Sequence, residues 1–306
     1  MYRTLPTLLM AALLIGSLGV APDAEAYKRT QTCDSTGTLA CDPGEEPKPI
    51  EWPIRCIHYR INEEGSGDFP ADPGSEFSSE LRQIVRDSFG AWNDVSCSDF
   101  QMVDNGLTFV DEAEYLQSTP DENENVIVWK DDRWPYQNTG AFAITSVTFN
   151  PKDGTIADAD IEINSDSWTY EHLDSSQTGN GSSTIDLQNT LTHEVGHFLG
   201  LDHPENAPQS TMNGTAPPGE IKKRSLEDDD IDGICAVYPA GSPRAMCDDP
   251  SDFELPDVFN GGGDGNGRRG AGCSSTTGAP PSWLWVLLAV GLWRFRTNDG
   301  RTDTDC

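Results

Sequence analysis

The residues best suited to chemistry lie in one short segment, Leu191–Pro204, which reads LTHEVGHFLGLDHP. His193 and His197 are four residues apart, so on a helix they share one face and can bind a single metal ion through imidazole nitrogens. His203 follows as a third ligand. Three neutral imidazoles leave a fourth tetrahedral position for water, which is the open coordination of a catalytic zinc site. Glu194 is placed to take the proton of that water as general base.

These ligands need a helix that ends in a turn. Apolar residues recur at helical spacing and predict a helix over about 184–199. Its apolar stripe is expected to face the core and its histidines to face away. The stripe consists of Leu187, Leu191, Val195 and Phe198. Gly200 allows the positive φ of a helix C-terminal cap and lets the chain reverse. The turn therefore brings His203 back to the helix.

The surrounding residues, 52–239, carry nearly all of the periodic hydrophobic pattern and predict one α+β domain. A helix is expected around residues 81–92, with Ser78 or Ser79 as its N-cap, and a last helix over about 226–238. The expected strands are Cys56–Asn62, Leu107–Val110, Val126–Trp129, Ala141–Phe149 and Ile156–Ile163.

The N-terminus predicts export. Residues 1–26 combine a basic start, an apolar run over Leu8–Val20 and an A-x-A cleavage site at Ala24–Ala26, which is the pattern of a signal peptide. A membrane anchor is the alternative, but the run is shorter than the ~20 residues that a spanning helix needs. Residues 27–51 are expected to be irregular.

Composition excludes one class of partner. The 306 residues include 20 Lys or Arg and 51 Asp or Glu, for a formal net charge of −31, so the protein repels phosphate and we expect no nucleic-acid partner. Residues 240–281 are rich in Gly, Asp and Pro and are predicted to be a disordered spacer. Residues 282–306 are predicted to hold a hydrophobic helix and a basic tail, through the apolar run Trp283–Trp293 and the following Arg294 and Arg296.

Together these motifs resemble the metzincin zinc endopeptidases, through H-E-x-x-H-x-x-G-x-x-H and a downstream Met-turn at Ser210–Met212. The matrixin branch is the nearest resemblance. Its Leu-Gly-Leu-Asp-His ending is matched by Leu199–His203, and its later helix signature by Asp229, Asp230, Ile231, Gly233 and Ile234. The resemblance implies a five-stranded twisted mixed sheet, three helices and a zinc cleft between upper and lower subdomains. It also implies that Met212 underlies the zinc as packing and not as a ligand.

The chain also departs from that family. Matrixins bind a structural zinc through histidines before the active-site helix, whereas residues 141–164 contain none, so we expect one catalytic zinc only. In matrixins a Pro-x-Tyr segment follows the Met-turn, whereas this chain has different residues at 213–218. These residues should line the primed-side specificity pocket, so the substrate preference of that pocket cannot be carried over from the family. Four acidic residues could hold calcium, or form a solvated turn and strand face: Asp153, Asp158, Asp160 and Glu162.

Six cysteines of the exported chain are expected to form disulfides. Matrixin zymogens block zinc with a propeptide cysteine in an Arg-Cys-Gly context, which neither Cys33 nor Cys41 has. A Cys33–Cys41 disulfide is therefore favoured. Cys56 with Cys97 and Cys235 with Cys247 are the other expected pairs, among 15 possible connectivities.

The prediction for function is a zinc-dependent endopeptidase, a monomer acting on proteins or peptides outside the cytoplasm. A catalytically lapsed, surface-displayed metal-binding or adhesion module and a zinc hydrolase of other substrates are the alternatives. The tail resembles the sorting tails of myxobacterial surface proteins, which implies processing and lipid attachment near Cys273 and a membrane or cell-surface tether. A plain C-terminal anchor and an untethered secreted enzyme remain open.

Overall fold

The computed structural model describes residues 27–33, 40–136, 140–174, 178, 183–241, 247 and 285–288. The predicted signal peptide (1–26), nearly all of the spacer (240–281) with Cys273, and most of the tail (282–306) lie outside these residues. Within the described part of the chain, no helix has the length and apolar character needed to cross a membrane.

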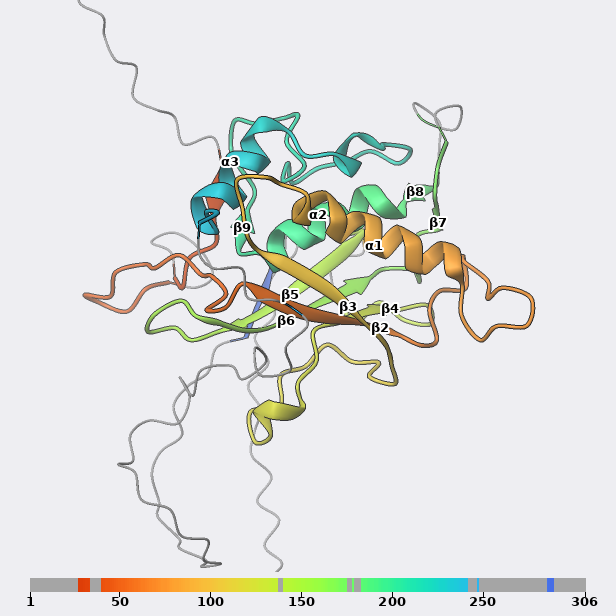
Figure 1. Ribbon diagram of the computed structural model, residues 1–306, viewed down its shortest axis with the longest axis horizontal. Coiled ribbons are helices and arrows are strands. Elements are labelled where there is room, and N and C mark those ends of the chain that lie inside the picture. The colour runs from red at the N-terminus through yellow and green to blue at the C-terminus, as the bar shows by residue number, and fades with distance from the viewer. Residues whose placement is uncertain are drawn as a thin grey trace, which may run out of the picture.

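Five strands form the mixed sheet of an α+β domain (Figure 1). Their order across the sheet is β5-β6-β4-β2-β3, in which β5 is antiparallel to β6 and all other neighbours are parallel. The sheet and its mixed character agree with the fold predicted from the sequence. The strands are β2 (Cys56–Asn62), β3 (Gln101–Thr108), β4 (Val126–Trp129), β5 (Ala143–Phe149) and β6 (Ile156–Ile163).

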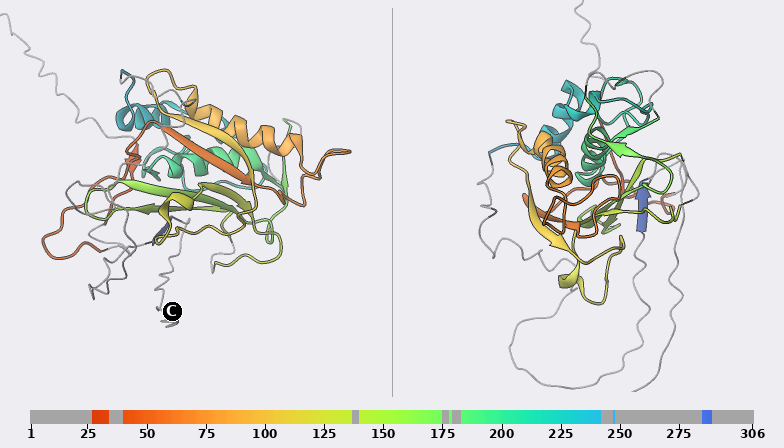
Figure 2. Two further views of the ribbon diagram at one scale, coloured as in Figure 1. Left: turned by 60° about the horizontal axis from the view of Figure 1, so that its bottom comes forward. Right: turned by 90° about the vertical axis from the view of Figure 1, so that its right-hand side faces the viewer.

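Three helices complete the domain: α1 (Ser79–Asn93), α2 (Leu187–Phe198) and α3 (Asp228–Val237). Helices α1 and α2 lie together on one face of the sheet, as the views of Figures 1 and 2 agree. Ser78 caps α1, since its side chain accepts a hydrogen bond from Leu81 N at 3.2 Å. Short 3-10 turns occupy Pro120–Glu122 (η1) and Lys222–Arg224 (η2).

The core fills the space between the sheet and these two helices. Tyr59 of β2 stacks on Phe89 of α1 with ring centroids 3.8 Å apart. Trp92 of α1 is fully buried and donates from Nε1 to the carbonyl oxygen of Thr192 in α2 at 2.8 Å. This hydrogen bond adds to the apolar contacts of the Trp92 ring, so α1 fixes the position of α2, the helix that carries His193 and His197.

The N-terminal segment, expected to be irregular, contains a short strand. β1 (Lys28–Arg29) pairs antiparallel with β9 (Leu201–Asp202), directly after α2. Thr30 N also donates to the carbonyl oxygen of Gly200 at 2.9 Å. The start of the described chain therefore holds the turn that leads to His203. A second short pair, β7 (Tyr170–Glu171) with β8 (Ile185–Asp186), is parallel and precedes α2.

The disulfides confirm one of the three expected pairs, Cys33–Cys41. The other two expectations are wrong, because the structure joins Cys97 to Cys235 and Cys56 to Cys247. The chain that leaves α1 lies against the end of α3, where Ala240 N donates to the carbonyl oxygen of Cys97 at 2.7 Å. Contacts between distant segments, which sequence spacing does not show, thus decide the pairing.

Of the tail 282–306, where a hydrophobic helix is expected, the structure describes residues 285–288, and these four residues are extended. Trp285–Leu288 form β10, which pairs antiparallel with Thr145–Thr148 of β5 and adds a sixth strand to the sheet. Without β10, β5 would be an edge strand with unpaired backbone groups, and an extended segment gains main-chain hydrogen bonds by pairing there. A helix over the same residues would leave that edge unpaired.

Candidate metal centre

The helix that carries the histidines has well-defined ends. Asp186 is the N-cap of α2, and its side chain accepts from Asn189 N at 2.7 Å. The helix ends at Phe198, and Gly200 follows with φ of +88°. A Cβ atom at position 200 would lie 2.7 Å from the carbonyl oxygen of Ile50, so both the backbone angle and the packing require glycine.

Two helical histidines and a third beyond the turn form one group. His203 Nε2 lies 3.1 Å from His193 Nε2 and 3.0 Å from His197 Nε2. In the described part of the chain, these residues are the one group of three or more His, Cys, Asp or Glu whose ligand atoms all lie within 4.8 Å of one another. The structure therefore brings together the three ligands predicted from the sequence.

Backbone carbonyls orient two of the three rings. His193 Nδ1 lies 2.6 Å from the carbonyl oxygen of Thr211, and His197 Nδ1 lies 2.9 Å from that of Leu201. Because a carbonyl only accepts, each Nδ1 carries the hydrogen and each Nε2 offers its lone pair to the centre of the group. The carbonyls fix both the tautomer and the direction of these ligands.

The electrostatics of the group also suit a metal. Burial lowers the pKa of His193 well below its usual value. Burial, together with the nearby His197, lowers the pKa of His203 to about 3. Both imidazoles are therefore neutral near pH 7, which is the form that binds a metal ion.

The donor set fits zinc. Two nitrogens at tetrahedral positions, each ~2.05 Å from a zinc ion, are about 3.3 Å apart, close to the two distances seen between the histidines. Three imidazole nitrogens match the protein ligands of catalytic zinc sites, which leave the fourth position to water or substrate.

Glu194 is the residue predicted to accept the proton. It follows the ligand His193 in α2 and is almost fully buried. Thr145 of β5 donates from Oγ1 to Glu194 Oε2 at 2.6 Å. Burial raises the pKa of Glu194, and the neighbouring His197 and the Thr145 hydrogen bond oppose that rise.

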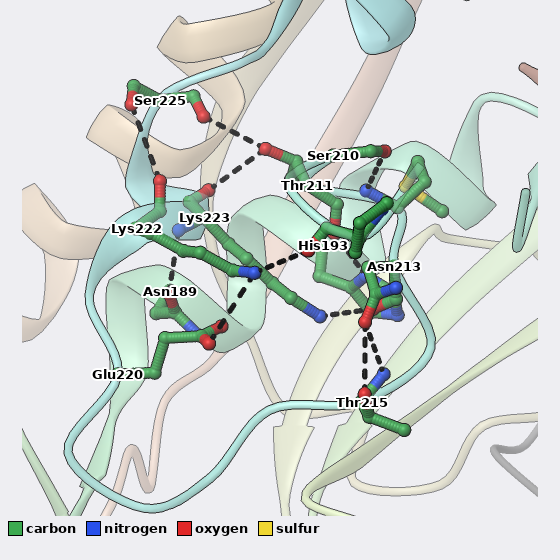
Figure 3. Close-up of polar contacts among 12 residues, drawn as sticks. Asn189, His193, Ser210, Thr211, Asn213, Thr215, Glu220, Lys222, Lys223 and Ser225 are labelled. Atoms are coloured by element: carbon green, nitrogen blue, oxygen red, sulfur yellow. Dashed lines mark hydrogen bonds and ion pairs between the residues drawn. The ribbon is translucent and has the colours of Figure 1, made fainter. Parts of the chain in front are cut away.

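Met212, which the resemblance places under the zinc, packs against the helix that carries His193 and His197. A Cβ atom on Gly196 of α2 would lie 2.0 Å from Met212 Sδ, so the sulfur packs directly against the helix backbone. Asp230 of α3, fully buried, holds this turn by accepting hydrogen bonds from Ser210 Oγ at 2.6 Å, Thr211 N at 2.7 Å and Met212 N at 3.0 Å. The same turn presents the Thr211 carbonyl to His193 (Figure 3).

The four residues proposed for calcium do not converge. Asp153 accepts a backbone hydrogen bond of its own turn at 3.0 Å. Asp158 and Asp160 are buried on β6 and hydrogen-bond to each other. Glu162, also buried on β6, accepts from the Tyr136 hydroxyl. We refer to the three β6 side chains, Asp158, Asp160 and Glu162, as the carboxylate row. Calcium stays a prediction, without a three-carboxylate group within the described residues to support it.

Sequence reasoning missed two side chains beside the histidines. Thr145 is polar in the inward-facing positions of β5, where Ala143 and Val147 are apolar, and this break in the alternation is the signal that could have found it. Lys223 of η2 is buried with only 3% of its surface exposed, and its Nζ donates to the carbonyl oxygen of Asn213 (Figure 3). One lysine in a run of three basic residues gives no sequence signal of burial.

Comparison with known proteins places this geometry in context. A family model described as Matrixin matches residues 68–239. Matrix metalloproteinase-C of Caenorhabditis elegans is 29% identical over 200 residues, which is 64% of this chain and 30% of the relative. Metalloendoproteinase 2-MMP of Arabidopsis thaliana is 26% identical over 171 residues (55% and 40%), and human neutrophil collagenase is 27% identical over 173 residues (56% and 32%). The chain thus spans well under half the length of these relatives.

Proposed function

Because the chain belongs to the matrixin family, we propose that it is a zinc-dependent endopeptidase that hydrolyses peptide bonds of proteins outside the cytoplasm. The observation that carries this proposal is the group of three histidines with a buried glutamate next to the first of them. The proposal also includes export of the protein and its tether to the cell surface, which are predicted from residues 1–26 and 282–306.

His193, His197 and His203 would hold the zinc ion through Nε2. When bound, zinc supplies Lewis-acid polarisation of the scissile carbonyl and lowers the pKa of water from 15.7 to about 7. The carbonyl oxygens of Thr211 and Leu201 keep two of these imidazoles turned toward the ion. Loss of either carbonyl contact would free a ring to rotate away.

Glu194 moves the proton in this account. Its carboxylate takes a proton from the attacking water and gives it to the nitrogen of the leaving amine. The Thr145 hydroxyl holds Oε2, so the other oxygen, Oε1, is the one left to exchange the proton. Burial raises the pKa of the carboxyl, which strengthens it as a base at neutral pH.

Digestion of a denatured protein by the purified zinc-loaded chain tests the proposal, with fragments identified by mass spectrometry. We expect cleavage that a zinc chelator abolishes and that added zinc restores. Glu194→Gln should retain zinc and lower kcat/KM by about 10²–10⁴-fold. Glu114→Gln, at an exposed loop position, is the matched control and should cleave like the wild type.

Each contrary outcome has a separate meaning. Unchanged cleavage by Glu194→Gln would show that the base is wrongly assigned. Cleavage that persists in chelator would exclude zinc from the reaction. A zinc-loaded wild type that cleaves no protein or peptide would favour the adhesion or binding module.

A further inference from the structure

A cavity of about 200 Å³ opens beside the histidines, and His193 and Glu194 form part of its wall. Residues 140–143 bound it on the β5 side and residues 214–216, just after the Met-turn, bound it on the other. This volume is below the ~300–1,000 Å³ of sites for drug-sized ligands, and suits a single side chain. Asn189 of α2 and Lys223 of η2 also line it.

Lys223 supplies the positive charge of this cavity, whose wall also contains the carboxyl group of Glu194. The side chain is buried, and its Nζ donates to the carbonyl oxygen of Asn213. Among the described residues, Lys222 pairs with Glu220 at 3.7 Å, whereas Lys223 forms no ion pair with any of them. A buried ammonium without a carboxylate partner is costly, so a ligand carboxylate that reaches it gains a strong charge-assisted hydrogen bond.

Asn189 adds a second donor. Its Oδ1 accepts from the backbone N–H of Lys223 at 2.8 Å, so what it can still offer a ligand is its amide NH₂ group. Beyond the catalytic pair, four polar side chains line the cavity: Asn189, Thr190, Thr215 and Lys223. The two threonine hydroxyls already donate within the chain, to the carbonyl oxygen of Asp186 and to Asn213 Oδ1. The other two side chains are a cation, Lys223, and an amide donor, Asn189. Both favour an anionic acceptor over a cationic or apolar side chain.

The position of Glu194 tells which substrate residue enters. Glu194 gives its proton to the leaving nitrogen, which belongs to the residue after the scissile bond. A cavity with Glu194 in its wall is therefore next to that residue. We propose that this cavity binds the side-chain carboxylate of a Glu or Asp that follows the scissile bond, with Lys223 as the specificity-determining residue. This inference rests on the proposed endopeptidase function.

Matched peptides that differ only in the residue after the cleaved bond test it, with Glu, Gln, Leu or Lys at that position and the cleavage point mapped by mass spectrometry. For the zinc-loaded wild type we expect kcat/KM for the Glu peptide to exceed that for Gln and Leu by roughly 10-fold or more, and Lys to be poorest. A wild type that cleaves the Leu or Lys peptide as well as the Glu peptide would overturn the inference.

Two adjacent lysines supply the variants. Lys223→Met should lose the preference for Glu and favour Leu. Lys222→Met should keep the wild-type preference, because Lys222 donates to the Pro208 carbonyl at 2.7 Å and does not line the cavity. A preference for Glu that survives in a folded Lys223→Met would contradict the assignment. If Lys223→Met does not fold, the Glu-to-Gln ratio of the wild type still decides.

The controls separate this inference from the proposed function. Cleavage without a preference for Glu would remove the role of the cavity and leave the endopeptidase intact. Failure to cleave any of the peptides, or any denatured protein, would remove the endopeptidase itself.

Discussion

The histidine group and the carboxylate row are two places where the sequence offers several metal-binding side chains close together. In the first, two Nε2–Nε2 distances are 3.0 and 3.1 Å, and backbone carbonyls hold the opposite nitrogen of two of the three rings. In the second, two carboxyls bond to each other and the third to a phenol. Only the first leaves its metal-binding atoms directed at a common point.

The difference comes from how each element projects its side chains. Alternate residues of a strand point the same way, ~6.6 Å apart, so the carboxylates of the row run side by side and are not directed at one point. Residues four apart on a helix are neighbours, and the turn at Gly200 brings a third ligand from another direction. Suitable residue types thus make a metal site only where the backbone makes them converge.

The sharpest test of this comparison removes one member of each set. Loss of a group that hydrogen-bonds to a metal ligand lowers metal affinity by up to roughly 100-fold. His197→Ala removes a ligand itself, so it should lower zinc affinity by more than that and should abolish cleavage. Asp160→Asn should leave zinc binding within a factor of two or so of wild type. Metal titration of both variants measures the effect, and loss of zinc from Asp160→Asn would show that the two regions are not separate.

The next largest effect is expected from Asp230. Asp230→Ala removes the acceptor of three hydrogen bonds from the Met-turn, leaving buried donors unpaired, at a cost of about 3 kcal/mol in the free energy of unfolding. The freed turn should also weaken zinc binding by about 10-fold or more, since the Thr211 carbonyl orients His193. Urea denaturation and zinc titration measure both, with the exposed Asp232→Ala as control. A normal zinc affinity of Asp230→Ala would show that zinc binding by His193 does not depend on the Met-turn.

The carboxylate row should affect the pH dependence of the free energy of unfolding and not the binding of a metal ion. Burial raises the pKa of Asp158 to about 8, and it also raises that of Asp160. Between about pH 4 and 8 the folded state keeps a proton that the unfolded chain releases, so the free energy of unfolding falls as pH rises, by up to about 1.4 kcal/mol per unit. Asp158→Asn should flatten this dependence and stabilise the protein at pH 8. Equal pH slopes in urea denaturation of variant and wild type would contradict it.

The smallest effect is expected from Met212, which packs against α2 and is predicted not to bind the ion. Met212→Leu keeps a similar volume, so it should cost less than about 1.5 kcal/mol and retain zinc and much of the activity. Thermal unfolding and metal analysis measure these quantities. Loss of zinc from a folded Met212→Leu would mean that the sulfur takes part in binding.

Local pattern predicted most of the framework. The bounds of Cys56–Asn62, Val126–Trp129 and Ile156–Ile163 match β2, β4 and β6, because alternating or continuous apolar runs mark strands on a core. β3 was expected only over 107–110 but covers Gln101–Thr108, since its Asp104 and Asn105 hide the strand pattern. Parallel pairing with β2, a contact between distant segments, makes those polar residues a strand.

The candidate site divides in the same way. The histidines and Glu194 could be predicted because they fall within eleven residues of one helix and turn. Thr145 and Lys223 come from other elements, β5 and η2, and only the folded chain brings them beside Glu194. The disulfides of Cys56 and Cys97 were missed for the same reason.

In the proposed function, three histidines hold a zinc ion with one position open for chemistry. X-ray absorption at the zinc edge of the purified, zinc-loaded chain measures this directly. We predict one zinc per chain with three nitrogen neighbours at ~2.0–2.1 Å and one further oxygen neighbour. A sulfur neighbour, a fourth protein nitrogen that closes the site, or oxygen neighbours alone, as the carboxylate row would provide, would contradict the account.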